Sequence, residues 1–329
     1  MKALPELICP AGNPAALRTA LESGADAVYV GFADDTNARN FPGLNFSRRA
    51  MGEAILQTRA AGRKLLIAIN TFPRAGEQEL WRRAVDDAAE MGADAVILAD
   101  LGLLAYAAKR HPGLRLHLSV QASASSAEAI RFYHEAFGVK RVVLPRVLTV
   151  EEIAEICAEI PVEAEIFAFG GLCVMAEGRC SLSSYATGRS PNMNGVCSPA
   201  EDVRYVPSAK GTLSKLGDFT INEFAPDEPA GYPTLCKGRF RARDTTGYLF
   251  EEPTSLNTIP LLPRLIEAGV AALKIEGRQR GRAYVGQVTR SFRAALDSCG
   301  RGEVPAAAGL DSLTEGSRQT AGAYERAWR

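Results

Sequence analysis

Short apolar runs alternate along the chain with longer segments in which apolar residues recur every three or four positions. Runs rich in Val, Ile and Leu are typical of buried parallel strands, and the longer segments are typical of amphipathic helices. This alternation predicts repeated βα units. The predicted strands cover residues 4–9, 27–31, 64–70, 95–100, 114–121, 141–146, 162–169 and 271–276.

The predicted helices begin and end at residues that usually mark helix boundaries. Residues with short polar side chains precede them, and glycines follow several of them. The predicted caps are Asn13, Ser47, Ser125 and Thr149, and the predicted stops are Gly24, Gly62, Gly92, Gly113 and Gly138. Segments 23–30 (SGADAVYV) and 91–98 (MGADAVIL) repeat the same step from helix to strand, which indicates that one type of unit is reused.

Eight such units predict an α/β fold of the (β/α)₈ TIM-like barrel type, with an open doubly wound sheet as the alternative. Between the seventh and eighth strands, about a hundred residues rich in Gly, Pro and Ser lack this rhythm. We expect barrel units 1 to 7 in residues 1–169, a cysteine-bearing insertion in 170–270, and the last unit with a tail in 271–329. The tail resembles a surface segment, with Tyr324 and Trp328 as aromatic anchors.

Polar residues stand where the predicted strands end, and the active sites of such barrels gather at these ends. Their catalytic roles are unknown at this stage, and polar residues are also ordinary where strand ends meet solvent. The pocket candidates are Asn70, Asp100, Gln121 and Glu276, and the candidate substrate-binding residues are Arg39, Arg146 and Arg278.

The charge balance argues against a nucleic-acid partner. Lys and Arg together number 38, as do Asp and Glu, so the chain has no excess of positive charge with which to bind a phosphate backbone. Arg278, Arg280 and Arg282 form a local basic run, which is more often a solvated surface. No transmembrane window and no secretory signal are recognisable, so we expect a cytoplasmic protein in a reducing compartment.

Four of the seven cysteines fall in the predicted insertion. Cys173, Cys180, Cys197 and Cys236 are separated by six, sixteen and thirty-eight residues. Structural zinc sites usually use close cysteine pairs, whereas a four-iron cluster accepts ligands from dispersed loops, so the spacing favours a cluster over zinc. Unligated thiols and disulfides remain alternatives, although an odd number of cysteines fits a disulfide framework poorly.

The remaining cysteines and the histidines are weaker candidates for a reactive site. Cys157 and Cys299 are expected to pack, and Cys9 at most lines the pocket floor. Only three histidines exist, His111, His117 and His134, and only His117 lies in a predicted strand, where it could point into the barrel. No nucleophile elbow, dinucleotide-binding glycine motif or phosphate-binding loop is present.

Several segments are nevertheless familiar in sequence and in order. They are CPAGN at 9–13, DDTNARNF at 34–41, GLNF at 43–46, VQASA at 120–124, VVLPRVL at 142–148, GLCVMAEGRC at 171–180, GYPTLCKGR at 231–239, EEPTSLNT at 251–258 and KIEGRQR at 274–280. Over its whole length the chain resembles the collagenase-like U peptidase family, and within it the branch that acts in ubiquinone biosynthesis.

This resemblance implies an oxygen-independent hydroxylase that acts on the aromatic ring of a prenylated phenol, a ubiquinone precursor. It also implies one [4Fe-4S] cluster on Cys173, Cys180, Cys197 and Cys236 and a heterodimer with a homologous UbiV-like subunit. Prephenate is implied as the oxygen donor, and a lipid carrier protein is a candidate for delivering the phenol. A peptidase and an RNA-base hydroxylase are the competing hypotheses within the same family.

Overall fold

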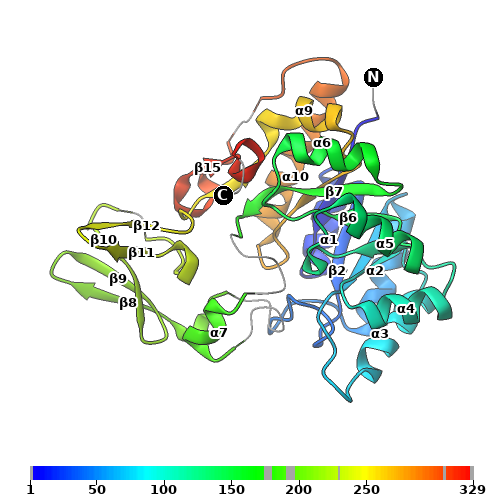
Figure 1. The fold of residues 1–329 in the computed structure, drawn as a ribbon, viewed down its shortest axis with the longest axis horizontal. Coiled ribbons are helices and arrows are strands. Elements are labelled where there is room, and N and C mark those ends of the chain that lie inside the picture. Colours follow the sequence, from blue (N-terminus) through cyan, green and yellow to red (C-terminus); the bar gives the residue numbers. More distant parts are fainter. Residues whose placement is uncertain (1–2, 174–179, 190–196, 229, 307–308, 327–329) are drawn as a thin grey trace.

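The computed structural model describes residues 3–173, 180–189, 197–228, 230–306 and 309–326. Within these ranges, eight parallel strands close into a barrel, because β14 pairs with both β1 and β7. The predicted (β/α)₈ architecture is confirmed (Figure 1). The barrel strands are β1 (Glu6–Pro10), β2 (Ala27–Gly31), β3 (Lys64–Ile69), β4 (Ala95–Leu98), β5 (Leu116–Leu118), β6 (Arg141–Val143), β7 (Glu163–Gly171) and β14 (Ala272–Ile275).

Helices follow the strands and cover the outside of the barrel (Figure 1). None of those in the described ranges is long and apolar enough to cross a membrane. They are α1 (Pro14–Glu22), α2 (Arg48–Ala60), α3 (Glu79–Glu90), α4 (Leu101–Arg110), α5 (Ala127–Phe137), α6 (Val150–Glu159), α9 (Leu262–Ala268) and α10 (Arg282–Gly300).

Several strands end earlier than the apolar pattern predicts, because the polar residues after them leave the hydrogen-bonded ladder. The strand predicted over 114–121 pairs only from Leu116 to Leu118, and a 3₁₀ turn, η1 (Val120–Ala122), follows it. The predicted cap of α5 was wrong by one position. The hydroxyl of Ser126, not that of Ser125, accepts the hydrogen bond from the backbone N–H of Ala129.

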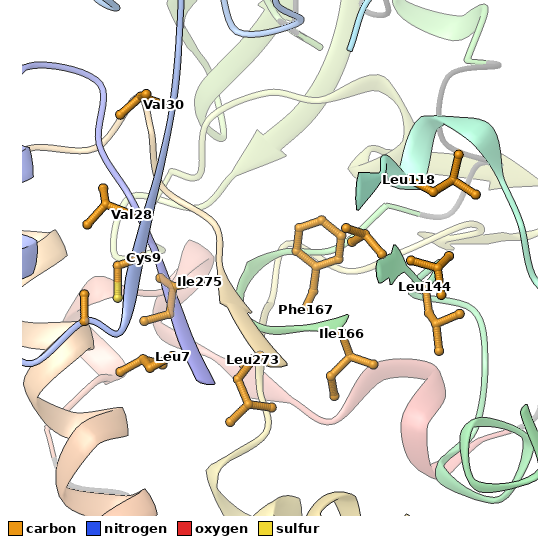
Figure 2. Close-up of a cluster of buried hydrophobic side chains, with 14 of the residues drawn as sticks. Leu7, Cys9, Val28, Val30, Leu118, Leu144, Ile166, Phe167, Leu273 and Ile275 are labelled. Carbon is orange, nitrogen blue, oxygen red and sulfur yellow. The ribbon is translucent and has the colours of Figure 1, made fainter. Parts of the chain in front are cut away.

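The apolar core has two parts, set by the alternation of side chains along each strand. Outward-facing residues such as Leu7, Val28 and Leu273 belong to the large cluster shared with the helices (Figure 2). A smaller cluster that includes Ile8 and Leu66 comes from the alternate positions of the same strands. The barrel interior is therefore packed rather than open.

The segment between β7 and β14 contains short elements of its own. A helix, α7 (Leu182–Thr187), precedes a three-stranded antiparallel sheet of β8 (Val203–Ser208), β9 (Gly211–Leu216) and β10 (Phe219–Phe224), and a hairpin of β11 (Arg239–Ala242) and β12 (Thr245–Tyr248). The sheet and hairpin lie to one side of the barrel, at the left of Figure 1. The chain then returns through β13 (Ser255–Asn257), which runs antiparallel to β7, and through α9, which packs on α6.

The C-terminal segment is not a surface tail. Its strand β15 (Gln319–Thr320) pairs with β13, and Leu310 is buried. Tyr324 is buried as well, and its hydroxyl donates a 2.8 Å hydrogen bond to the carbonyl oxygen of Phe167. Tyr324 is therefore a core residue rather than a surface anchor, and its buried hydroxyl is hydrogen-bonded to β7. Trp328 lies outside the described residues.

Candidate functional site

A cavity of about 280 Å³ lies at the mouth of the barrel, where the C-terminal ends of the strands face the segment that follows β7. One part of its wall comes from the barrel and includes Tyr29, Asn70 and Phe167. Another part comes from the inserted segment and includes Ser198 and Tyr232. The strand ends and the insertion therefore share one site.

All four cysteines of the insertion line this cavity. Cys173 follows β7, Cys180 and Cys197 stand on either side of α7, and Cys236 lies in the 3₁₀ turn η3 (Leu235–Lys237). The seven cysteines of the chain all lie in the described ranges, and no disulfide joins any of them. Four thiols from separate segments thus face one space.

The thiols lie close enough to affect one another's ionisation. Burial raises the pKa of Cys197 to about 11, and the charges of Cys173 and Cys180 raise it as well, whereas Arg39 opposes the shift. Burial raises the pKa of Cys236 to about 12, with the same two thiols adding to it and Lys237 opposing it. Without a bound cation these groups would be neutral thiols at physiological pH.

The described thiols face one cavity, but they do not form a ready-made site for a single metal ion. Across the described residues, no group of three or more His, Cys, Asp or Glu side chains converges closely enough to hold one metal ion. A structural zinc ion needs each thiolate at about 2.3 Å from a single centre. A cubane cluster instead takes one thiolate at each of four irons and therefore accepts a wider arrangement.

Two arginines share one carboxylate at the cavity. Glu276 directly follows β14, and its carboxylate oxygens accept hydrogen bonds from Nη2 of Arg39 at 3.3 Å and from Nη2 of Arg146 at 3.0 Å. Burial raises the pKa of Glu276, but Arg146 and Arg39 outweigh this effect and hold it below its ordinary value. The guanidinium of Arg146 also stacks on Phe167, 3.4 Å from the ring centroid. We call Arg39, Arg146 and Glu276 the mouth cluster.

A glycine gives Glu276 its position. Gly170, on β7, has a φ of 128°, and a Cβ built on it would lie 2.6 Å from the Cβ of Glu276. Any side chain at residue 170 would be strained and would also displace the carboxylate. The mouth cluster therefore depends on a neighbouring strand having no side chain at this point.

The third candidate arginine has a different environment. Arg278 is only 5% exposed and lines the cavity, yet Nη1 of its guanidinium has no hydrogen-bond partner among the described residues. The ring centroid of Tyr29 lies 5.7 Å from the guanidinium carbon. Burial, opposed in part by Tyr29 and Glu276, lowers the pKa of Arg278 to about 10.

The remaining pocket candidates separate into two groups. Asn70 and Gln121 line the cavity, and the side-chain oxygen of Asn70 accepts a 3.1 Å hydrogen bond from the backbone N–H of Ala38. Asp100 does not belong to the described lining. Its carboxylate instead caps α4 by accepting a hydrogen bond from the N–H of Leu103 at 2.9 Å. A cap and a pocket residue look alike in sequence, because both are polar and follow a strand.

Two contributions to the site were not expected from the sequence. Glu315, in the C-terminal segment, lines the cavity and forms an ion pair with Lys237, which follows Cys236. No periodicity or motif linked these residues, which lie 78 positions apart. Lys274 also lines the cavity, and here a signal existed, because it is the one charged residue within the apolar strand β14.

Charged residues also fill the opposite, N-terminal end of the barrel. The guanidinium of Arg141 forms ion pairs with Glu6 at 2.6 Å, with Glu163 at 2.6 Å and with Glu165 at 3.4 Å. Glu165 is fully buried and also pairs with Lys274 at 2.6 Å. We call these five residues the basal network, of which Lys274 also reaches the cavity.

Hydrolytic machinery does not assemble at the cavity. His117 is buried beside the basal network, where its Nε2 accepts a 3.1 Å hydrogen bond from Nε of Arg115. Burial and the neighbouring arginines lower its pKa well below the ordinary value. His111 pairs with Asp86, and no histidine in the described ranges lines the cavity. Cys9 is also absent from the described lining, because it packs against α10 and accepts a hydrogen bond from Thr289.

Comparisons with known proteins give the family. The model of peptidase family U32 matches residues 12–325. The tRNA hydroxylation protein P of Escherichia coli (strain K12) is 32% identical over 318 residues, which cover 91% of this chain and 69% of that protein. The 23S rRNA 5-hydroxycytidine C2501 synthase of the same organism is 30% identical over 297 residues, or 89% of this chain and 39% of that protein.

A third relative bears a peptidase name. The collagenase of Porphyromonas gingivalis is 30% identical over 304 residues, which cover 89% of this chain and 66% of that protein. The resemblance seen in the sequence motifs is therefore confirmed at the level of the family. The match extends over the barrel, the insertion and most of the C-terminal segment, and the chain belongs to peptidase family U32.

Proposed function

We propose that this chain is the iron–sulfur subunit of an oxygen-independent hydroxylase that acts on the ring of a ubiquinone precursor. It would work in the cytoplasm within a UbiU–UbiV type heterodimer. The observation that carries the proposal is that four cysteines line the same cavity as the polar residues at the strand ends. Support for the reaction type comes from two relatives that are named as hydroxylation enzymes of RNA.

Cys173, Cys180, Cys197 and Cys236 would hold one [4Fe-4S] cluster. When bound, such a cluster supplies one-electron transfer beside the cavity. The chain itself supplies compensating charge, since Arg39 and Lys237 both favour the thiolate forms of neighbouring cysteines.

The cavity wall suits an aromatic substrate and an acidic co-substrate. Tyr29 and Phe167 contribute aromatic rings to the wall, each with a cationic group over one face, while the mouth cluster and Arg278 supply positive charge. Prephenate, the proposed oxygen donor, carries two carboxylates that arginines bind well. Arg39, Arg146 and Arg278 are the candidates for this role, with Asn70, Gln121 and Glu276 beside them.

The test combines metal analysis with a metabolite assay. Protein purified without oxygen should contain about four irons and four sulfides per chain, and Cys→Ser variants of the quartet should lose them. A strain that lacks the gene should accumulate the unhydroxylated prenyl phenol when grown without oxygen, and only the intact gene should restore ubiquinone. Zinc in place of iron, or full activity without metal, would overturn the proposal.

Hydroxylation of an RNA base is the second candidate, favoured by the names of two relatives. The same deletion strain separates the two functions, because mass spectrometry of its tRNA and rRNA would then reveal a missing hydroxylated nucleoside with ubiquinone unchanged. The formal net charge of zero gives no general affinity for RNA. A peptidase activity would instead survive replacement of the four cysteines.

A further inference from the structure

We infer that Arg278 and Gln121 form a binding subsite for a small hydroxy acid, in which Arg278 receives a carboxylate and the Gln121 amide binds a hydroxyl group. The inference rests on the proposed function in one respect, since the bound acid would be the oxygen-donating co-substrate. It goes further by assigning the two ends of the ligand to two residues. It also gives Arg278 a different role from Arg39 and Arg146, which already form ion pairs with Glu276.

Arg278 is a buried cation at the cavity. A buried guanidinium normally has a carboxylate partner, because removing a charge from water without compensation is costly. Arg39 and Arg146 meet this requirement through Glu276, whereas Arg278 forms no ion pair within the described part of the chain. With a pKa of about 10 it still carries its charge at neutral pH. The site therefore holds a cation whose partner is supplied from outside the chain.

The fold reserves space for this guanidinium. A Cβ built on Gly31, at the end of β2, would lie 2.5 Å from Nη1 of Arg278 and 2.6 Å from Cγ of Asn37. On the other side, a Cβ on Gly12 would lie 1.9 Å from the carbonyl oxygen of Arg278. Two glycines thus allow the side chain and backbone of Arg278 to be packed closely, which fixes the direction of the guanidinium.

Gln121 is a second buried polar group at the cavity, on a different strand end. It is 8% exposed, it lines the cavity, and its Oε1 has no hydrogen-bond partner among the described residues. The turn that holds it is constrained, because the hydroxyl of Ser119 accepts a hydrogen bond from the N–H of Gln121 and Ser123 adopts a left-handed conformation with a φ of 53°. A buried amide without a partner is as costly as any other buried polar group.

The two groups together define the ligand. They come from the ends of β14 and β5, which are separated around the barrel by β6 and β7, so one molecule must extend across the cavity to meet both. A hydroxyl group satisfies the amide in either orientation, since it both donates and accepts. A cavity of about 280 Å³ has room for a small acid.

Calorimetric titration of the anaerobically purified protein tests this subsite, with prephenate as the hydroxy acid and phenylpyruvate as an acid without a hydroxyl. Arg278→Met should weaken prephenate binding by about 100-fold, because a charge-assisted bidentate contact is lost, and Arg278→Lys should fall between this variant and the unmodified protein. Arg282→Met, which removes an exposed charge four residues away, is the matched control and should bind as the unmodified protein does.

Gln121→Met should weaken prephenate binding by about tenfold and leave phenylpyruvate binding unchanged. Gly31→Ala serves as a second perturbation, which displaces the guanidinium without removing it and should also weaken binding of both acids. Unfolding curves recorded for each variant identify any that fail to fold. Equal affinity of Arg278→Met and the unmodified protein for prephenate, with both folded, would overturn the inference.

The failure of this subsite and the failure of the proposed function remain distinguishable. A cluster-containing protein that restores ubiquinone but binds prephenate independently of Arg278 would refute only the subsite. A protein that binds prephenate through Arg278, but whose loss leaves ubiquinone unchanged, would refute only the proposed function.

Discussion

The two ends of the barrel treat buried arginines in opposite ways. At the N-terminal end, Arg141 is surrounded by the carboxylates of Glu6, Glu163 and Glu165, so its charge is fully compensated. At the C-terminal end, Arg39 and Arg146 share the single carboxylate of Glu276, and Arg278 forms no ion pair in the described structure. One end balances its charge internally, whereas the other keeps a surplus of positive charge.

This difference separates a structural role from a binding role. A compensated network can only lose stability when one member is removed, because the partners are left buried without their counter-charge. An uncompensated cation lowers the stability of the free protein and is satisfied when an anion binds. Substitutions at the two ends should therefore have different consequences for stability and for anion binding.

The largest effect is expected for Arg141→Met. Glu6, Glu163 and Glu165 would each lose one of two cationic partners and keep only Lys64, Arg115 and Lys274, respectively. The free energy of unfolding should therefore fall by about 3 kcal/mol. Urea unfolding measures this change. Arg278→Met is the matched substitution at the other end and should leave the stability of the free protein equal or higher. A similar loss for both variants would show that the two ends do not differ.

An intermediate effect is expected for Glu276→Gln. Arg39 and Arg146 would lose their shared carboxylate, so the free energy of unfolding should fall by about 1–3 kcal/mol. Sulfate should recover much of this loss, because anions would occupy the positively charged cavity, and the same salt should change the stability of Arg141→Met far less. Urea unfolding at low and high sulfate compares the two variants. An equal recovery in both would contradict the localisation of surplus charge at the mouth.

A smaller effect concerns pH at the basal end. The pKa of His117 lies well below its ordinary value because of burial and the neighbouring Arg141 and Arg115. Below a pH of about 6.5, the unfolded chain therefore binds a proton that the folded chain does not, and stability falls by at most about 1.4 kcal/mol per pH unit. His117→Gln lacks this titration, so its stability relative to the unmodified protein should rise on acidification. Parallel pH profiles of the two proteins would exclude the effect.

The smallest effect is expected for Tyr324→Phe. This variant loses the hydrogen bond to the carbonyl oxygen of Phe167 and should lose about 1 kcal/mol of stability. Because Phe167 lines the cavity, prephenate affinity should fall with it, whereas the basal network should be unaffected. Calorimetry and urea unfolding of this variant thus test whether the C-terminal segment, which lies outside the barrel, supports ligand binding at the mouth of the barrel.

Much of the barrel follows from the sequence, because apolar alternation and helix boundaries are local signals. The strand predicted over 27–31 coincides with β2, and that predicted over 64–70 differs from β3 by one residue. The strand predicted over 114–121 is less well matched, since the pairing ends at Leu118 where the hydroxyl of Ser119 begins a turn. Local residue preferences do not show where the hydrogen bonding between strands ends and such a turn begins.

The site was only partly predictable. Asn70, Gln121 and Glu276 follow strands and do reach the cavity, but Asp100 occupies an equivalent position and caps a helix instead. Glu315 could not be found from the sequence, since its contact with Lys237 depends on how the C-terminal segment returns to the barrel. The contrast among the three arginines also depends on three-dimensional distances that no spacing encodes. The cofactor and the substrate of the site stay predictions.

The place at which the cysteine segment leaves the barrel has a consequence for the order of assembly. β7 and β14 pair directly with each other, so the barrel closes beneath the segment without requiring any contact from the thiols. The scaffold can therefore form first, and the proposed cluster would be inserted afterwards. Assembly of the proposed cluster would then be a separate maturation step on a chain that is already folded.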